Sequence, residues 1–187
     1  MAIEMKRKGY GQVEPNHLSG IVTGQIYAQL PAATVSGSGD SEKKTPIAQL
    51  EQGQFAKYDY VKGVVDFDGE GEFMLVYNEE KLYDERKQSH KDFVYKATDF
   101  TDGFMYPRLI KTNVGDIFTT NTFGANTKGS DAEITNPVTL SVNDTLYVGA
   151  DGFLTTTKGD AATPVFKVVK EYTMPDGQPG VKIQRVQ

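Results

Sequence analysis

Cysteine and tryptophan are both absent from this 187-residue chain, and histidine occurs only twice. The absence of cysteine excludes disulfide bonds, thiolate nucleophiles and cysteine-ligated zinc sites. His17 and His90 lie in separate polar stretches, with no serine in a strained turn and no acid at a spacing typical of a catalytic triad. We therefore expect a non-enzymatic protein, held together by packing and hydrogen bonds, with no catalytic residues, no metal and no cofactor.

Long hydrophobic runs and basic clusters are missing as well. Hydrophobic residues make up 38% of the chain and the mean hydropathy is -0.45, and no apolar run approaches the roughly 20 residues of a membrane helix. Twenty Lys and Arg residues against 25 Asp and Glu residues give a net charge of -5, which disfavours nucleic acid as a partner. The start MAIEMKRKGY is followed by no hydrophobic signal region. We expect a protein made in the cytoplasm that binds neither membrane nor nucleic acid.

Short β-type runs dominate the chain from Tyr58 onward, separated by Gly, Asp and Asn. Their spacing predicts a mainly β fold, a compact antiparallel β-barrel or β-sandwich over residues 58–187. Residues 1–57 are predicted to form an extended N-terminal arm, with one strand in SGIVTGQIYAQL (19–30) and a flexible segment at 31–46. At most one short helix is expected, at 78–88, where Asn78 suits an N-cap and acids precede bases.

The stretch DFDGEGE, residues 66–72, contains alternating acids that resemble part of a calcium-binding loop. The ligand pattern is incomplete, and β-type runs lie on both sides of it. Asp68-Gly69 instead suits the turn of a β-hairpin, because this pair readily adopts positive φ angles. We therefore predict a hairpin here rather than a metal site.

Aromatic residues are abundant, with ten Tyr and ten Phe concentrated in stretches such as YDYVKGVVDF and DTLYVGADGF. Most are expected in the core or in cross-strand pairs. Any surplus of exposed tyrosine would make a face that binds sugar or protein, since the ring offers contact area at low entropic cost.

The C-terminal third shows a repeated pattern. Gly115-Asp116 and Asn143-Asp144 each precede a β-type run, and the second run meets a turn at Asp151-Gly152. Leu146 and Val148 alternate with Tyr147 across this strand. A further turn in MPDGQPG leads to VKIQRVQ, whose alternation places Val181, Ile183 and Arg185 on one face. Two successive hairpins are predicted.

The phrase VNDTLYVGADGFLTT, followed by a Pro-containing strand and a terminal hairpin, resembles the C-terminal part of capsid decoration proteins of tailed bacteriophages, also called cement or minor capsid proteins. The resemblance covers residues 112–187 by pattern. It implies a virion structural protein that binds the outside of a phage capsid and stabilises the shell. Its partners would be the major capsid protein and neighbouring copies of itself, in a homo-oligomer on the capsid surface.

The segment GIVTGQIYAQL suits the addition of a strand to an exposed sheet edge of a neighbour. The candidate partner-binding residues are Ile21, Val22, Ile26, Tyr27 and Leu30. Pairing of this segment within its own domain uses the same hydrogen bonds and stays open as an alternative. At the level of function the alternatives are a head-fibre, tail or neck virion protein, a carbohydrate-binding adhesin, and a hydrolase with paired carboxylates.

Overall fold

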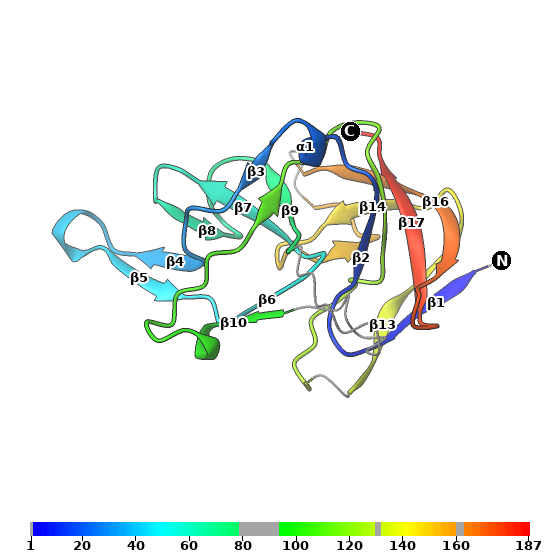
Figure 1. Ribbon diagram of the computed structural model, residues 1–187, viewed down its shortest axis with the longest axis horizontal. Coiled ribbons are helices and arrows are strands. Elements are labelled where there is room, and N and C mark those ends of the chain that lie inside the picture. Colours follow the sequence, from blue (N-terminus) through cyan, green and yellow to red (C-terminus); the bar gives the residue numbers. More distant parts are fainter. Residues whose placement is uncertain (1, 79–93, 130–131, 160–162) are drawn as a thin grey trace.

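The computed structural model describes residues 2–78, 94–129, 132–159 and 163–187 (Figure 1). The predicted mainly β fold is confirmed: antiparallel sheets pack as a sandwich, and no closed barrel is found among these residues. The helix predicted at 78–88 lies, apart from Asn78, outside the described residues. The α-helix that is described, α1 (Ser19–Val22), has four residues, and in the described ranges no helix has the length and apolarity to cross a membrane.

A six-stranded sheet holds the C-terminal part of the chain together with one N-terminal strand. In order across the sheet its strands are β15 (Leu154–Thr155), β14 (Thr145–Val148), β16 (Val165–Thr173), β17 (Pro179–Arg185), β12 (Ile117–Thr120) and β2 (Val13–His17). The pairs β14–β15 and β16–β17 are antiparallel neighbours, so both predicted hairpins are confirmed. Leu146 and Val148 are buried and Tyr147 between them is only half-buried, as the alternation predicted.

Two turns of the same design lead into β12 and β14, at residues 113–116 and 141–144. In each turn the aspartate side chain accepts a hydrogen bond from the backbone N–H three residues earlier, at 2.8 Å and 2.7 Å respectively. The third residue has a positive φ, 96° at Gly115 and 77° at Asn143, which glycine and asparagine tolerate best. Asp116 and Asp144 therefore shape the entry to a strand.

The two turns also contact the β16–β17 hairpin in the same way. The first exchanges two backbone hydrogen bonds with Arg185, both of 2.9 Å, and the second exchanges two with Val168, of 2.8 and 2.9 Å. One row of paired residues across the four strands consists of Ile117, Gln184, Lys167 and Thr145. The register therefore defines a local two-fold axis between Lys167 and Gln184, which relates the two turns.

A five-stranded sheet forms the middle layer of the protein. Its strands, in order, are β3 (Ile26–Tyr27), β11 (Leu109–Ile110), β9 (Phe73–Val76), β7 (Phe55–Asp59) and β8 (Val64–Asp66). Phe55 packs against Phe118 and Phe166 of the six-stranded sheet, with ring centroids 6.4 and 5.4 Å apart. Ala56 and Met74 face a second cluster on the opposite side. Because both faces of β9 are buried, its sequence FMLV is continuously apolar rather than alternating.

Three two-stranded pairs complete the fold. They are β1 (Ile3–Lys8) with β13 (Glu133–Leu140), β6 (Gln49–Glu51) with β10 (Val94–Lys96), and β4 (Ala33–Ser36) with β5 (Lys43–Pro46). Short 3-10 turns occur at Gly39–Ser41 and Ala97–Asp99. The β4–β5 hairpin projects from the left end of the molecule in Figure 1. It occupies the segment predicted to be flexible, residues 31–46, and positive φ angles at Gly37 and Gly39 shape the connection between its strands.

Residues 1–57 belong to these same sheets rather than to an arm of their own. Met5, Val13 and Leu18 lie in the main core, β1 pairs with β13 and β2 pairs with β12. The boundary predicted at residue 57 falls inside β7, so it does not separate two bodies. The prediction of an arm rested on the local sequence, which is rich in turn residues, whereas the strands that pair with β1 and β2 lie a hundred or more residues away.

The single strand predicted over residues 19–30 is also corrected, because α1 and the two-residue β3 replace it. Asp116 accepts hydrogen bonds from the backbone N–H and the hydroxyl of Ser19, at 3.0 and 2.7 Å. A Cβ added at Gly20 would lie 2.3 Å from the carbonyl oxygen of Lys111. These contacts from distant residues hold the chain in a tight turn that local propensity does not indicate.

A buried ion pair connects the N-terminal strand to the rest of the chain. The Arg7 guanidinium donates to the Glu51 carboxylate at 2.6 Å, and both side chains are fully buried. The same carboxylate accepts the backbone N–H groups of Gly11 and Asn126, at 2.9 and 2.5 Å. Arg7 also donates to the carbonyl oxygen of Gly124, at 2.5 Å.

Replacing Glu51 by Gln should lower the free energy of unfolding by about 3 kcal/mol, because it leaves the Arg7 charge buried without its counter-ion. Urea unfolding followed by circular dichroism measures the change. The control is Glu4→Gln, which removes the exposed Lys6–Glu4 pair and should cost less than about 1 kcal/mol. Equal losses in the two variants would contradict the assigned role of the buried pair.

Gly152→Ala tests the β14–β15 turn against Gly177→Ala in the β16–β17 turn. Both glycines have a positive φ, 78° and 86°, so each alanine should cost roughly 1–2 kcal/mol. A Cβ at Gly152 would also lie 2.0 Å from the carbonyl oxygen of Phe55, whereas a Cβ at Gly177 would meet nothing within 4 Å. Thermal and urea unfolding should therefore show a larger loss for Gly152→Ala, by at least about 1 kcal/mol. Indistinguishable losses would show that the close approach to Phe55 does not constrain the turn.

Candidate functional site

The turn between β7 and β8, residues 60–63, holds two large apolar side chains in solvent. Tyr60 is 71% exposed and Val61 is 87% exposed. The strands on either side are almost entirely buried, so these two side chains stand out from a well-packed layer. We call residues 60–63 the apolar turn.

A buried carboxylate fixes the backbone of the apolar turn. Asp59 is 1% exposed, and one of its oxygens accepts the backbone N–H groups of Val61 and Lys62, at 2.8 and 3.0 Å. Its other oxygen accepts the backbone N–H of Glu70 at 3.0 Å. The apolar turn is therefore tied both to the end of β7 and to the chain that follows β8.

The charge of Asp59 is stabilised where it lies. Burial alone would raise the pKa of its carboxyl, but hydrogen bonds from the backbone of Lys62, Glu70 and Val61, together with the Lys62 ammonium, outweigh burial and hold the pKa below its ordinary value. The Lys62 Nζ lies 3.9 Å from Asp59 and 3.4 Å from Asp66. The anchor of the turn is thus an ionised group with fixed partners.

Three tyrosine rings connect the apolar turn to the interior. Tyr58 packs against Tyr27 of β3 with centroids 5.3 Å apart, and against Tyr60 at 5.0 Å in an edge-on arrangement. The Tyr58 hydroxyl accepts the backbone N–H of Gln29 at 3.1 Å. Such ring pairs contribute about 0.5–1.5 kcal/mol beyond the area that they bury. The exposed Tyr60 ring is therefore supported from beneath.

The five predicted partner-binding residues are spread over several environments. Ile21 packs against the main core and Leu30 against the second cluster. Ile26 pairs with Ile110 in the five-stranded sheet. Val22, on α1, is 84% exposed, and Tyr27 alone among the five joins the ring cluster beneath the apolar turn.

The sequence did not indicate that Tyr60 and Val61 are exposed, because they lie in YDYVKGVVDF, an aromatic-rich stretch expected in the core or in cross-strand pairs. The turn was signalled by Asp59, whose side chain accepts backbone N–H groups from the next residues, and by Gly63, which has a φ of 65°. An acid followed by a glycine four residues later was the signal that could have located the turn.

The hairpin predicted over residues 66–72 is wrong. Strands β8 and β9 do not pair, because both lie against β7, as the partners Tyr58↔Val65 and Ala56↔Met74 show. Gly69 is needed for close approach, since a Cβ there would lie 2.4 Å from Asp66 and 2.7 Å from Asp59.

No group of three or more His, Asp or Glu side chains suited to a metal occurs in the described ranges. Of the two histidines, His17 is exposed on β2 and His90 lies outside those ranges.

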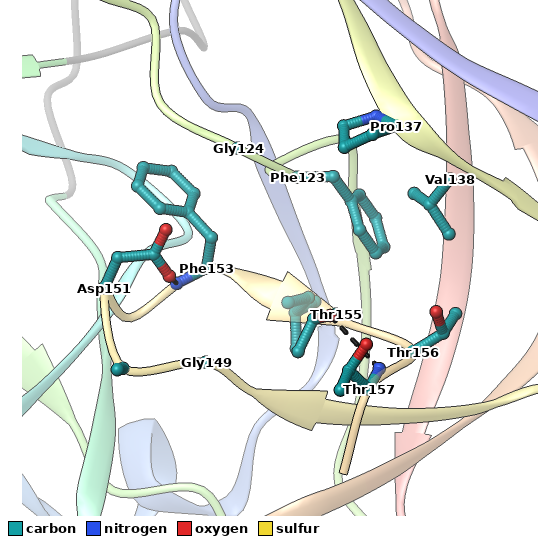
Figure 2. Close-up of a pocket in the computed structure, with 12 residues that line it drawn as sticks. Phe123, Gly124, Pro137, Val138, Gly149, Asp151, Phe153, Thr155, Thr156 and Thr157 are labelled. Carbon is teal, nitrogen blue, oxygen red and sulfur yellow. Dashed lines mark hydrogen bonds between the residues drawn. The ribbon is translucent and has the colours of Figure 1, made fainter. Parts of the chain in front are cut away.

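A cavity of about 560 Å³ lies elsewhere on the protein, beside the β14–β15 turn (Figure 2). One side is formed by residues 149–157 and the other by Phe123, Gly124, Pro137 and Val138. The Phe153 and Phe123 rings and the side chains of Asp151, Thr155 and Thr157 surround the space in Figure 2. No lining residue of this cavity belongs to the apolar turn.

The chain matches no family model, no curated protein and no solved structure. Among the described residues, two surfaces combine features suited to binding: the apolar turn and the cavity beside the β14–β15 turn.

Acidification should weaken the apolar turn through Asp59. Because the folded pKa of Asp59 lies below the unfolded value of about 4, its contribution to stability is complete above pH of about 5 and is lost as pH falls through the folded pKa. Asp59→Asn should therefore lower stability at neutral pH, and the difference from the unmodified protein should shrink toward pH of about 3. Urea unfolding across this range measures it. The control is Asp102→Asn, at an exposed turn; a difference for Asp59→Asn that is constant with pH would contradict the assignment.

Proposed function

We propose that this protein is a non-enzymatic virion structural protein that binds the outside of a bacteriophage capsid through its apolar turn and stabilises the shell. The observation that carries the proposal is the fixed exposure of Tyr60 and Val61. Exposed apolar residues scattered over a surface need no explanation. Two adjacent ones, held out on a turn by a buried carboxylate, are what a docking anchor requires.

Preorganisation gives the apolar turn its value as an anchor. A binding surface loses affinity when its loops and side chains must be ordered on contact. Here the backbone is already fixed by Asp59 and the Tyr60 ring already rests on Tyr58. Tyrosine is also among the residues that contribute most at protein interfaces, because its ring is large and has few rotatable bonds.

The β4–β5 hairpin supports the same end of the molecule. Lys44 of β5 donates to the carbonyl oxygen of Gly63 in the apolar turn, at 3.2 Å, and Ala32, just before β4, bridges to Val65 of β8. The hairpin and the turn therefore form one end, with lysines beside an apolar centre. A polar, charged rim around an apolar centre is the usual anatomy of a protein interface.

We propose attachment through side chains, in place of the strand addition that the segment GIVTGQIYAQL suggested. Residues 26–27 pair with β11 inside the protein's own sheet. One of the two edge strands of the six-stranded sheet, β2, carries Pro15 opposite Phe118, and proline has no N–H with which to pair another strand. A head-fibre, tail or neck protein would use the same kind of anchor, and the choice of a capsid over these rests on the resemblance of residues 112–187. A carbohydrate-binding adhesin is the second candidate function, favoured by the cavity in Figure 2.

The experiment measures binding of the purified protein to capsids prepared without it, from the phage whose genome encodes the chain. Replacing both Tyr60 and Val61 by Ser should weaken co-sedimentation by at least about tenfold, since the central anchor of the interface is lost. The matched control is Val114→Ser, which changes another exposed valine, 68% exposed, on a turn that is also closed by an aspartate. This control should bind as the unmodified protein does.

Shell stability gives the second readout. Particles lacking the protein should assemble but release their genome at a lower temperature, and adding the unmodified protein or the Val114→Ser variant should restore the temperature. No binding to the capsid by the unmodified protein, or unchanged particle stability without it, would overturn the proposed function. Normal capsid binding by the Tyr60→Ser, Val61→Ser variant would show that the apolar turn is not the docking surface.

A further inference from the structure

We infer that the cavity beside the β14–β15 turn is a binding site for a neutral saccharide. This inference goes beyond capsid binding and uses none of the residues of the apolar turn. The cavity volume, about 560 Å³, lies within the range of roughly 300–1,000 Å³ that is typical of small-molecule sites. Its lining combines apolar and polar side chains.

Part of the lining is apolar. It consists of Phe123, Pro137 and Val138 on one wall and of Phe153 and Leu154 on the wall formed by residues 149–157. Figure 2 shows the Phe123 ring between Pro137 and the threonines, and the Phe153 ring above the β14–β15 turn. The exposed ring of Pro137 presents a C–H surface that suits the apolar face of a pyranose ring, whereas the two phenylalanine rings add little accessible surface. Both phenylalanine side chains are fixed by burial, because only 1% of Phe123 and 5% of Phe153 is exposed.

The wall formed by residues 149–157 also carries hydroxyl groups and one carboxylate. Thr155, Thr156 and Thr157 line it together with Asp151. The Asp151 Oδ1 accepts the backbone N–H of Phe153 at 3.1 Å, and the Thr155 hydroxyl accepts that of Thr157 at 3.1 Å. Within the described part of the chain, Asp151 Oδ2 and the hydroxyls of Thr156 and Thr157 have no hydrogen bond. These groups can therefore accept from and donate to adjacent sugar hydroxyls.

A buried amide lies directly behind the cavity wall. Asn136 is 2% exposed, and neither its Oδ1 nor its Nδ2 has a hydrogen-bond partner among the described residues. A Cβ added at Gly124, which lines the cavity, would lie 3.4 Å from that Oδ1. An unpaired buried amide costs free energy, so a polar ligand, or a water molecule bound with it, at the Gly124 wall would offset that cost.

The β14–β15 turn, which carries Asp151, is rigid before any ligand arrives. Gly152 donates to the carbonyl oxygen of Gly149 at 2.9 Å and accepts from the backbone N–H of Phe55 at 2.7 Å. The Gln54 side chain donates to the carbonyl oxygen of Asp151 at 2.6 Å. Little order therefore has to be imposed on the site when it binds.

The charges around the cavity select a neutral ligand. Among the residues that the structure describes, Asp151 is the single charged side chain that lines the cavity, and neither Lys nor Arg does. A carboxylate repels phosphates, nucleotides and acidic sugars, whereas it accepts strongly from neutral hydroxyl groups. A saccharide matches this set better than a peptide does, because it combines a ring face with several hydroxyl groups in a small volume.

The test is a titration of the ¹⁵N-labelled full chain with a panel of methyl glycosides of glucose, galactose, mannose and N-acetylglucosamine, followed by NMR. We expect at least one of them to cause saturable shifts confined to the amides of residues 123–124, 137–138 and 149–157. Asp151→Asn retains an oxygen that can accept from Phe153 but loses the charge. Asp151→Asn and Thr156→Val should each weaken the binding constant by about fivefold or more, the range expected for one lost hydrogen bond.

Asp102→Asn provides the matched control, because Asp102 accepts the backbone N–H two residues ahead, as Asp151 does, but lies outside the cavity. It should bind the same glycoside with unchanged affinity, and so should the Tyr60→Ser, Val61→Ser variant. The inference is overturned if none of the four glycosides causes saturable shifts at the cavity. It is overturned equally if both cavity variants bind as the control does, or if capsid protein alone shifts these amides. Because the readout uses no capsid, its failure leaves the proposed capsid function standing.

Discussion

The contact between Arg7 and Glu51 is the interaction on which the arrangement of the chain depends. It joins β1 to β6, and through Glu51 it also fixes the backbone at Gly11 and Asn126. Removing a charged pair from water is costly unless every remaining polar group is satisfied. Here both carboxylate oxygens accept backbone N–H groups, whereas the Arg7 Nε has no hydrogen-bond partner among the described residues. The carboxylate has its partners only when segments near residues 7, 51 and 126 come together. The N-terminal residues are therefore part of the folded body.

Aspartates at turns act in this cysteine-free chain much as local cross-links. Asp116 and Asp144 close equivalent turns on either side of the β16–β17 hairpin, and Asp59 and Asp151 close the turns that form the two candidate binding surfaces. A carboxylate that accepts backbone N–H groups restricts a turn without needing a large core beneath it. Turn-closing aspartates thus shape strand entries at Asp116 and Asp144, and they hold the candidate binding surfaces at Asp59 and Asp151.

Local signals in the sequence predicted what is local in the structure. The hairpin at Asp151-Gly152 and the alternation of Val181 and Ile183 follow from neighbouring residues, and both are present. What the sequence could not predict depends on distant contacts, such as Gly20 against Lys111. The order β9–β7–β8 was missed for the same reason, since a hairpin and a crossover can have the same turn residues. The resemblance to decoration proteins is not tested by this geometry and stays a prediction.

The two candidate surfaces come from different sheets, and this separation bears on how they could act together. The apolar turn extends from β7 and β8 of the five-stranded layer, whereas the cavity lies beside the β14–β15 turn of the six-stranded sheet. Phe55 of β7 packs against Phe166, and its backbone N–H holds Gly152 of the cavity turn, but Phe55 does not line the cavity. Because no lining residue is shared and a packed core joins the two sheets, occupation of one surface does not require rearrangement of the other. A protein that docks on a shell through the apolar turn can therefore keep its cavity formed and available to a second ligand.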